Sequence, residues 1–121
     1  MKLLFATLLL LASPLSQAAS VQVGCDPSKA TQQSVAHADA GDTVIVFAPG
    51  NPTTGYQWLS KEGVMSVYNS TGGGAVGSGG FYNFAIAADK KSDRKVFTFE
   101  YKRGWEQAEP ASVCYVKVMV K

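Results

Sequence analysis

Few side chains in this sequence are spaced as enzyme chemistry requires. The chain has one histidine, His37, and no serine or cysteine nucleophile stands next to it, so a structural role is the simpler interpretation. No H-x-x-x-H or C-x-x-C spacing offers a metal site, and the acidic residues are scattered without an evident carboxylate pair. The sequence therefore predicts a protein that is not an enzyme and that needs neither a metal nor a cofactor.

One glycine-rich stretch fits a nucleotide-binding pattern only formally. "GGGAVG" (Gly72–Gly77) has the spacing G-x-G-x-x-G. A dinucleotide site needs this motif to open a helix, because the helix N-terminus takes the pyrophosphate. Here the stretch runs into an alternating strand pattern, and no Lys-Ser/Thr pair follows it as a P-loop would require. Neither kind of nucleotide site is predicted.

The two cysteines, Cys25 and Cys114, stand near opposite ends of the chain. In an oxidising compartment they would form one disulfide between the ends of the domain. Two buried free thiols are the alternative. Both interpretations stay open, because the sequence does not fix the Cα separation that a disulfide requires.

The N-terminal segment has the pattern of a secretory signal peptide. It combines a short basic start, an apolar run (Leu3–Ala12) and small residues at Ser16 and Ala18. Cleavage is expected after Ala18, and the apolar run is too short to span a membrane. No later segment is long enough either, so residues 19–121 are expected to form one exported domain, either periplasmic or secreted.

A lipid anchor is a competing interpretation of the same region. "VGC" (Val23–Cys25) loosely resembles a lipoprotein cleavage box. However, Gln22 stands where an aliphatic residue is expected, and the apolar run ends far upstream at Ala12. Lipid anchoring at Cys25 is therefore disfavoured.

The charge is low and is absent from two long stretches. The net charge is +2 for the whole chain and +1 without Lys2. A near-neutral domain has no electrostatic footprint for nucleic acid. No charged residue stands between Ala48 and Ser60 or between Gly63 and Ala88.

Short strand patterns fill the chain, and no segment resembles a long amphipathic helix. Alternation is clearest in three runs whose apolar members share one face: Tyr82, Phe84 and Ile86; Phe97, Phe99 and Tyr101; and Cys114, Val116, Val118 and Val120. Further strands are expected at Asp42–Ala48, Gly55–Ser60 and Val64–Tyr68, with a weak, broken first strand at Ser20–Val23 and Gln32–Ala38. About seven to eight short strands in roughly 100 residues predict an all-β fold, an immunoglobulin-like antiparallel β-sandwich.

Between Tyr68 and Phe81 lies "NSTGGGAVGSGG", which has no strand character. Loops of this length are usually functional or disordered. The stretch also holds the glycosylation sequon Asn69-Ser70-Thr71, which only a eukaryotic secretory pathway would use.

The stretch "NPTTGYQW" contains a loop that is expected to be stiff. Pro52 fixes its own φ and keeps Asn51 extended, while the Asn51 side chain can close a turn by bonding local backbone. Gly55 permits a backbone angle that a β-carbon would forbid, and Tyr56 and Trp58 can root the loop in the core. Thr53 and Thr54 would form its exposed tip.

Three loops, this one among them, have a composition that together suits a protein cleft. They are the first loop (Asn51–Tyr56), the glycine loop (Gly77–Gly80) and the tryptophan loop (Arg103–Trp105). Alternate connections of an immunoglobulin-like sandwich cluster at one end, so the three can form one edge. A neutral, stiff edge enters a cleft without burying an unpaired charge, and arginine and tryptophan are favoured at binding hot spots.

The three loops resemble those of the chagasin-like inhibitors of papain-type cysteine peptidases. "NPTTGYQW" matches the family's N-P-T-T-G-aromatic-x-W loop, "GSGG" is similar to its G-x-G-G loop, and "YKRGWE" is similar to its R-P-W loop. The order and approximate spacing agree along essentially the whole mature chain. One residue departs from the family, since Gly104 stands where a proline is expected and would let Trp105 move.

The resemblance implies a monomeric, reversible, tight-binding inhibitor of papain-like, cathepsin L-type peptidases. It places the first loop over the catalytic thiolate and imidazolium, the glycine loop on the non-primed side and Trp105 on the primed side, with Arg103 beside it. The peptidase-binding residues that it implies are Asn51, Pro52, Thr53, Thr54, Gly55, Tyr56, Gly77, Ser78, Gly79, Gly80, Arg103, Gly104 and Trp105.

A second class of function remains open. A secreted immunoglobulin-like module could bind carbohydrate or a surface partner through Tyr82, Asn83 and Trp105 if these side chains were exposed together. The two functions differ in their dependence on Thr54, which only the inhibitor would place inside a partner's cleft.

Overall fold

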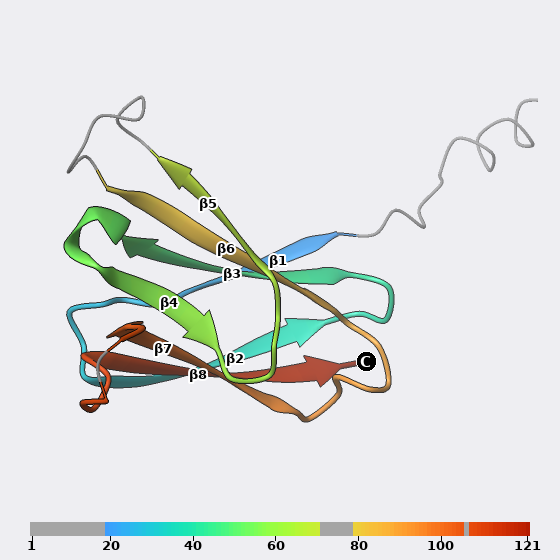
Figure 1. Cartoon of the computed structure of the whole chain (residues 1–121). Coiled ribbons are helices and arrows are strands. Elements are labelled where there is room, and N and C mark those ends of the chain that lie inside the picture. The colour runs from blue at the N-terminus through green and yellow to red at the C-terminus, as the bar shows by residue number, and fades with distance from the viewer. Residues whose placement is uncertain (1–18, 71–78, 106) are drawn as a thin grey trace, which may run out of the picture.

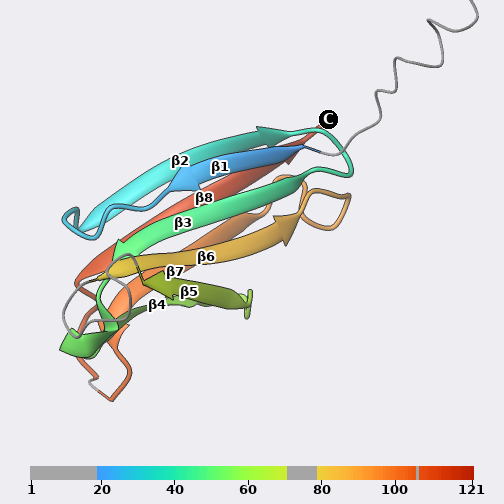
Figure 2. The ribbon, with the colours of Figure 1, turned by 90° about the horizontal axis from the view of Figure 1, so that it is seen from above.

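The computed structural model describes residues 19–70, 79–105 and 107–121 as a sandwich of two four-stranded sheets (Figures 1 and 2). Sheet A has the order β1 (Ser20–Gly24), β3 (Thr43–Gly50), β6 (Gly80–Ala87) and β5 (Ser66–Ser70). Sheet B has the order β2 (Thr31–Ala38), β8 (Ser112–Val120), β7 (Val96–Arg103) and β4 (Tyr56–Ser60). The predicted all-β sandwich is confirmed. Among the described residues, no helix is long and apolar enough to cross a membrane.

Two edge pairs depart from the otherwise antiparallel arrangement that the sequence predicts. β1 pairs with β3 in parallel, and β2 pairs with β8 in parallel, while the other four pairs are antiparallel. The strand direction reverses at every connection, so odd-numbered strands all run one way and even-numbered strands the other. An odd strand beside an odd strand is therefore parallel, and so is an even strand beside an even one.

Two strand boundaries also differ from the prediction. The expected broken first strand is two complete strands, β1 and β2, which belong to different sheets. β5 begins two residues later than expected and includes Asn69 and Ser70, which the sequence assigned to the long connection. Antiparallel pairing of Asn69 with Phe81 and of Ser70 with Gly80 extends the strand, so backbone bonds outweigh the weak strand propensity of these residues.

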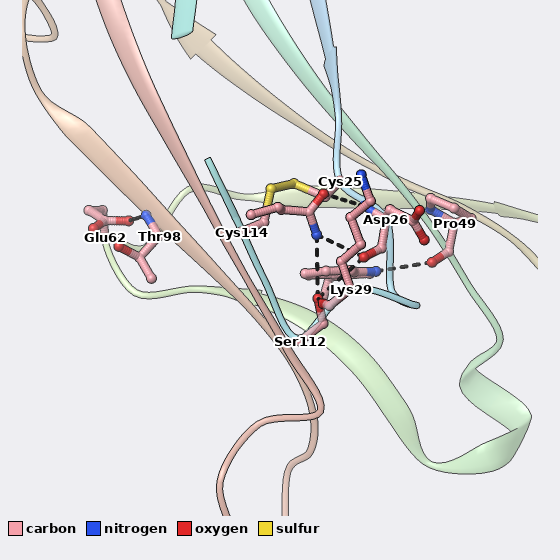
Figure 3. The surroundings of a disulfide bond; sticks show 10 residues. Cys25, Asp26, Lys29, Pro49, Glu62, Thr98, Ser112 and Cys114 are labelled. Atoms are coloured by element: carbon pink, nitrogen blue, oxygen red, sulfur yellow. Dashed lines mark hydrogen bonds between the residues drawn. A yellow bond between two sulfur atoms is a disulfide. The ribbon is translucent and has the colours of Figure 1, made fainter. Parts of the chain in front are cut away.

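The core lies between the inner faces of the two sheets. The three alternating runs bury the faces predicted for them, with Phe84, Phe99 and Val116 at most 1% exposed. The disulfide is present, since Cys25 and Cys114 are joined with a Cα–Cα distance of 5.9 Å (Figure 3). It closes a loop of 89 residues between the sheets, which in a chain-entropy model contributes about 4–5 kcal/mol by restricting the unfolded chain.

Hydrogen bonds fix the segment that follows Cys25. The Ser112 hydroxyl donates to the Lys29 carbonyl at 2.5 Å, and the Gln32 amide donates to the Asp26 carbonyl at 2.7 Å (Figure 3). These bonds hold the crossing from sheet A to sheet B, so the disulfide and the turn stabilise the same corner.

Candidate functional site

Three loops gather at the end of the sandwich where β3 and β7 finish (Figure 1). The strand register brings them together. Gly50 pairs with Gly80 at this end of sheet A, and Tyr56 pairs with Arg103 at the same end of sheet B. We call this the loop end. It comprises the first loop, the described part of the glycine loop (Gly79–Gly80) and the tryptophan loop. Gly77 and Ser78 lie outside the described residues.

The first loop is held by its own hydrogen bonds. Asn51 is extended, and its side-chain oxygen accepts from the Thr53 amide at 3.1 Å and from the Thr53 hydroxyl at 2.6 Å. The Thr54 hydroxyl donates to the Asn51 carbonyl at 2.7 Å and accepts from the Tyr56 amide at 3.3 Å. These bonds form the 3-10 turn η1 (Pro52–Thr54), whose three residues are exposed. The exposed tip is confirmed, and these bonds support its predicted stiffness.

Gly55 ends this turn in a conformation that a side chain would strain. Its φ is 88°, and its amide donates to the Pro52 carbonyl at 2.9 Å. A β-carbon built at Gly55 would also fall on the indole ring of Trp105. Glycine therefore both closes the turn and lets the tryptophan loop lie against the first loop.

Three packed aromatic rings, those of Tyr56, Tyr101 and Trp58, anchor the first loop to the core; we call them the aromatic column. Trp58 is 1% exposed, and its indole nitrogen donates to the Pro49 carbonyl at 3.0 Å (Figure 3). The Tyr101 ring lies 5.0 Å from that of Trp58 and 5.3 Å from that of Tyr56, between centroids. Both ends of the loop are therefore tied to sheet B.

Arg103 joins the first loop to the tryptophan loop. Its guanidinium carbon lies 4.6 Å from the Tyr56 ring centroid and 5.9 Å from that of Trp105. Its Nε donates to the Thr54 carbonyl at 3.3 Å. A guanidinium can stack on an aromatic ring and donate a hydrogen bond at once, so one side chain fixes the relative position of two loops.

The tryptophan loop presents the most exposed aromatic ring of the described residues. Trp105 is 71% exposed, as expected for a loop residue, although one edge of the ring touches Gly55. Gly104 does not have a positive φ, and a β-carbon there would meet the Gln57 amide nitrogen at 3.5 Å and no other described atom beyond its chain neighbours within 4 Å. The backbone at position 104 therefore does not itself demand glycine.

Gly79 and Gly80, the two described residues of the glycine loop, require glycine for different reasons. Gly79 has a φ of 75°, which favours glycine directly. A β-carbon at Gly80 would collide with the Asn69 carbonyl and would lie 2.8 Å from the Ser70 Cα. Gly80 therefore allows β5 and β6 to pair closely, which is a structural role as well as a candidate contact.

A neutral phenol lies beneath the loop end. Burial, together with the neighbouring Tyr101 and Tyr68, raises the pKa of Tyr82 above its usual range. Tyr82 is only 6% exposed, whereas Asn83 points to the other face of sheet A. The carbohydrate platform of Tyr82, Asn83 and Trp105 is therefore wrong, because strand alternation separates the first two side chains.

The described residues contain no group of three or more His, Cys, Asp or Glu residues placed to hold a metal. His37 is exposed on β2, near the far end of the sandwich.

The sequence did not predict the contacts that hold the first loop and the tryptophan loop together. It assigned Arg103 to the partner, which stays a prediction, and did not foresee that the side chain stacks on Tyr56 and Trp105. The sequence does indicate that Arg103 packs near the aromatic column. Arg103 follows Tyr101 by two residues in the same strand, so the two side chains share one face. The pairing of Arg103 with Tyr56, however, depends on register, which the local pattern does not give.

Comparison with known proteins places this geometry in a family. The family model described as "Chagasin family peptidase inhibitor I42" matches residues 37–118, a range that contains all three loops. No curated protein sequence matches the chain.

Three solved structures share the fold. The cysteine protease inhibitor EhICP2 from Entamoeba histolytica has a TM-score of 0.65 and 18% identity, covering 87% of this chain and 98% of that one. Amebosin has a TM-score of 0.58 and 23% identity, covering 88% and 100%. PbICP-C, solved in complex with falcipain-2, has a TM-score of 0.63 and 15% identity, covering 86% and 100%. The family match spans most of the chain, and the chain therefore belongs to the chagasin family of peptidase inhibitors.

Proposed function

We propose that the loop end enters the active-site cleft of papain-like cysteine peptidases and blocks substrate reversibly. The observation that carries this proposal is the fastening of the first loop, whose tip is exposed while its backbone is held by η1, Arg103 and the buried Trp58. A loop that is already ordered loses little conformational entropy on binding. The solved complex of the similar PbICP-C with falcipain-2 supports the choice of target class.

The three loops then have distinct roles. Thr53, Thr54 and Gly55 cover the catalytic thiolate and imidazolium with neutral atoms, so no charge is buried without a partner. Gly79 and Gly80, with Gly77 and Ser78 beside them in the sequence, lie along the non-primed side. Trp105 packs on the primed side, where its exposed ring supplies apolar contact.

The same geometry suggests that the inhibitor is not cleaved. The carbonyls of Asn51, Pro52 and Thr54 all accept hydrogen bonds within the protein, which holds the tip in a turn. A carbonyl held in a turn is not presented in the extended geometry needed for attack. Incubation with excess active papain should leave the mass unchanged, and a cut between Thr53 and Tyr56 would reject this part of the proposal.

The export of the protein belongs to the same proposal. Residues 1–18 are proposed to be a signal peptide removed after Ala18, which places the mature domain in the periplasm or outside the cell. The disulfide between Cys25 and Cys114 fits an oxidising compartment of that kind.

A pair of substitutions at Thr54 separates cleft insertion from damage to the loop. Thr54→Gln and Thr54→Glu both remove the hydroxyl that donates to Asn51, and they differ only in charge. If the tip enters a dry cleft, the Glu variant should inhibit papain at least about tenfold more weakly than the Gln variant, because an unpaired charge is costly to bury. Equal inhibition constants would show that the Thr54 side chain stays in water in the complex, which would reject insertion of the tip into the cleft.

A further inference from the structure

The outward face of sheet A differs from that of sheet B in charge. Strand alternation points Gln22, Ile45, Phe47, Asn69, Phe81 and Asn83 outward from sheet A, and none of the described strand residues on this face is charged. The outward face of sheet B carries Glu100, Lys102 and Lys117. An outer sheet face is normally wetted by polar and charged side chains, so the neutral face is the unusual one.

The neutral face holds an exposed aromatic pair over a shallow hollow. The Phe47 and Phe81 rings lie 6.3 Å apart between centroids, and Phe81 is 39% exposed. The hollow has a volume of about 390 Å³ and is lined by this pair with the amides of Gln22, Asn69 and Asn83. Gly24 makes room for the Phe47 ring, since a β-carbon at Gly24 would lie 3.1 Å from that ring.

This patch is continuous with the loop end. Phe81 follows Gly80 directly and pairs with Pro49, which precedes the Gly50 that pairs with Gly80. Asn69 pairs with Phe81 from the other side, in β5. The patch therefore begins one residue after the glycine loop along β6.

We propose that the patch centred on Phe81 and Phe47 is a second contact surface for the peptidase. It would pack on an uncharged, apolar part of the peptidase surface that flanks the cleft on the side of the glycine loop. The contact presupposes the proposed inhibition, and it extends the interface from the three loops onto the sheet. Stable protein interfaces bury about 800 Å² on each partner, with an apolar centre and a polar rim. The aromatic pair and its amides fit that composition.

Inhibition constants of four variants test this surface against papain. Phe81→Ser removes the aromatic centre, and Asn83→Lys adds a charge beside its cross-strand partner Phe47 without replacing either ring. Each should raise the inhibition constant by about tenfold, as expected for a contributing interface position. Val96→Ser and Gln33→Lys make the matching changes on the outer face of sheet B and should stay within about twofold of the unsubstituted protein.

The outcomes separate this contact from the inhibition itself. If the unsubstituted protein inhibits and both sheet A variants stay within twofold of it, the second contact is rejected and the three-loop inhibition stands. If the unsubstituted protein fails to inhibit, both proposals fall. Should Phe81→Ser unfold, as its melting temperature would show, Asn83→Lys decides alone. Concentration-dependent self-association that Phe81→Ser abolishes without changing inhibition would assign the patch to a second copy of the chain.

Discussion

Gly55 meets two demands at once, since its backbone has a positive φ and its missing β-carbon leaves space for Trp105. Gly55→Ala should lower the free energy of unfolding by about 1–2 kcal/mol through the backbone alone. It should also weaken papain inhibition by about a hundredfold, on the scale of a hot-spot loss, because the first loop and Trp105 can no longer keep their contact.

Gly41 offers a matched control for that substitution. It has a φ of 99° and lies at the end away from the loops, and among the described residues other than its chain neighbours no atom lies within 4 Å of the position that a β-carbon would take. Gly41→Ala should therefore cost similar stability in denaturant unfolding and leave inhibition unchanged. A parallel loss of inhibition in both variants would show that Gly55 acts only through global stability.

Arg103 is a positioning residue in this account. Arg103→Lys keeps the positive charge but loses the planar group that stacks on Tyr56, and it should raise the inhibition constant about fivefold. Hydrogen exchange at the Thr54 and Gly55 amides should speed up in the free protein, because the bond to the Thr54 carbonyl is lost. Unchanged exchange together with weaker inhibition would instead assign Arg103 to direct contact with the peptidase.

At the scale of elements, the tryptophan loop is the part that can be stiffened further. Arg103 is the last residue of β7 and so has the extended geometry that a following proline requires. Gly104→Pro should stabilise the free loop by about 0.4–1 kcal/mol and slow dissociation from papain a few-fold. Gly104→Ala, which adds a β-carbon without fixing φ, should change the dissociation rate less. Faster dissociation of the proline variant would mean that Trp105 must move to bind.

Strand alternation predicted most elements, because the inner faces are apolar and polar side chains occur among the outward positions. Phe97, Phe99 and Val116 are buried as their spacing indicates. The end of β5 was missed, because Asn69 and Ser70 have turn-forming side chains and only pairing with β6 makes them strand residues. The parallel edges were missed for a related reason, since the partner of β1 is set by chain crossings and not by its own residues.

The candidate site could likewise be predicted from the sequence only in part. The local chemistry of Asn51, Pro52 and Gly55 predicts the turn, because its bonds run between near neighbours in the sequence. The contacts of Arg103 with Thr54 and of Trp105 with Gly55 join residues about 50 positions apart, and no local pattern reports them.

At the scale of the whole molecule, Asp42 ties the first strand to the sandwich at the end away from the loops. Its carboxylate accepts from the Ala19 and Asp39 amides at 3.0 Å each, and these bonds lower the pKa of Asp42 below its usual value. The stabilisation is present above the unfolded-state pKa of about 4 and is lost as the pH falls through the lower folded-state pKa. If the chain is cleaved after Ala18, the Ala19 nitrogen becomes an ammonium group and the contact becomes an ion pair.

Asp42→Asn tests this pH dependence. The variant should melt at a lower temperature than the unsubstituted protein at pH 7, because each carboxylate oxygen of Asp42 accepts one of the two bonds and the NH2 group that replaces one oxygen in asparagine cannot accept. The difference in melting temperature should shrink as the pH falls towards about 2, where the native carboxyl is also protonated. A difference that stays constant across this range would contradict the role given to the Asp42 charge.

The most direct test of the central claim is titration of active papain with the mature protein, followed by hydrolysis of a small substrate and by the mass of the recovered inhibitor. The fastened first loop predicts that activity falls towards zero as inhibitor approaches about one equivalent, the stoichiometry of a tight complex, and that the inhibitor is recovered whole. Undiminished hydrolysis with folded protein well above the enzyme concentration would contradict the account.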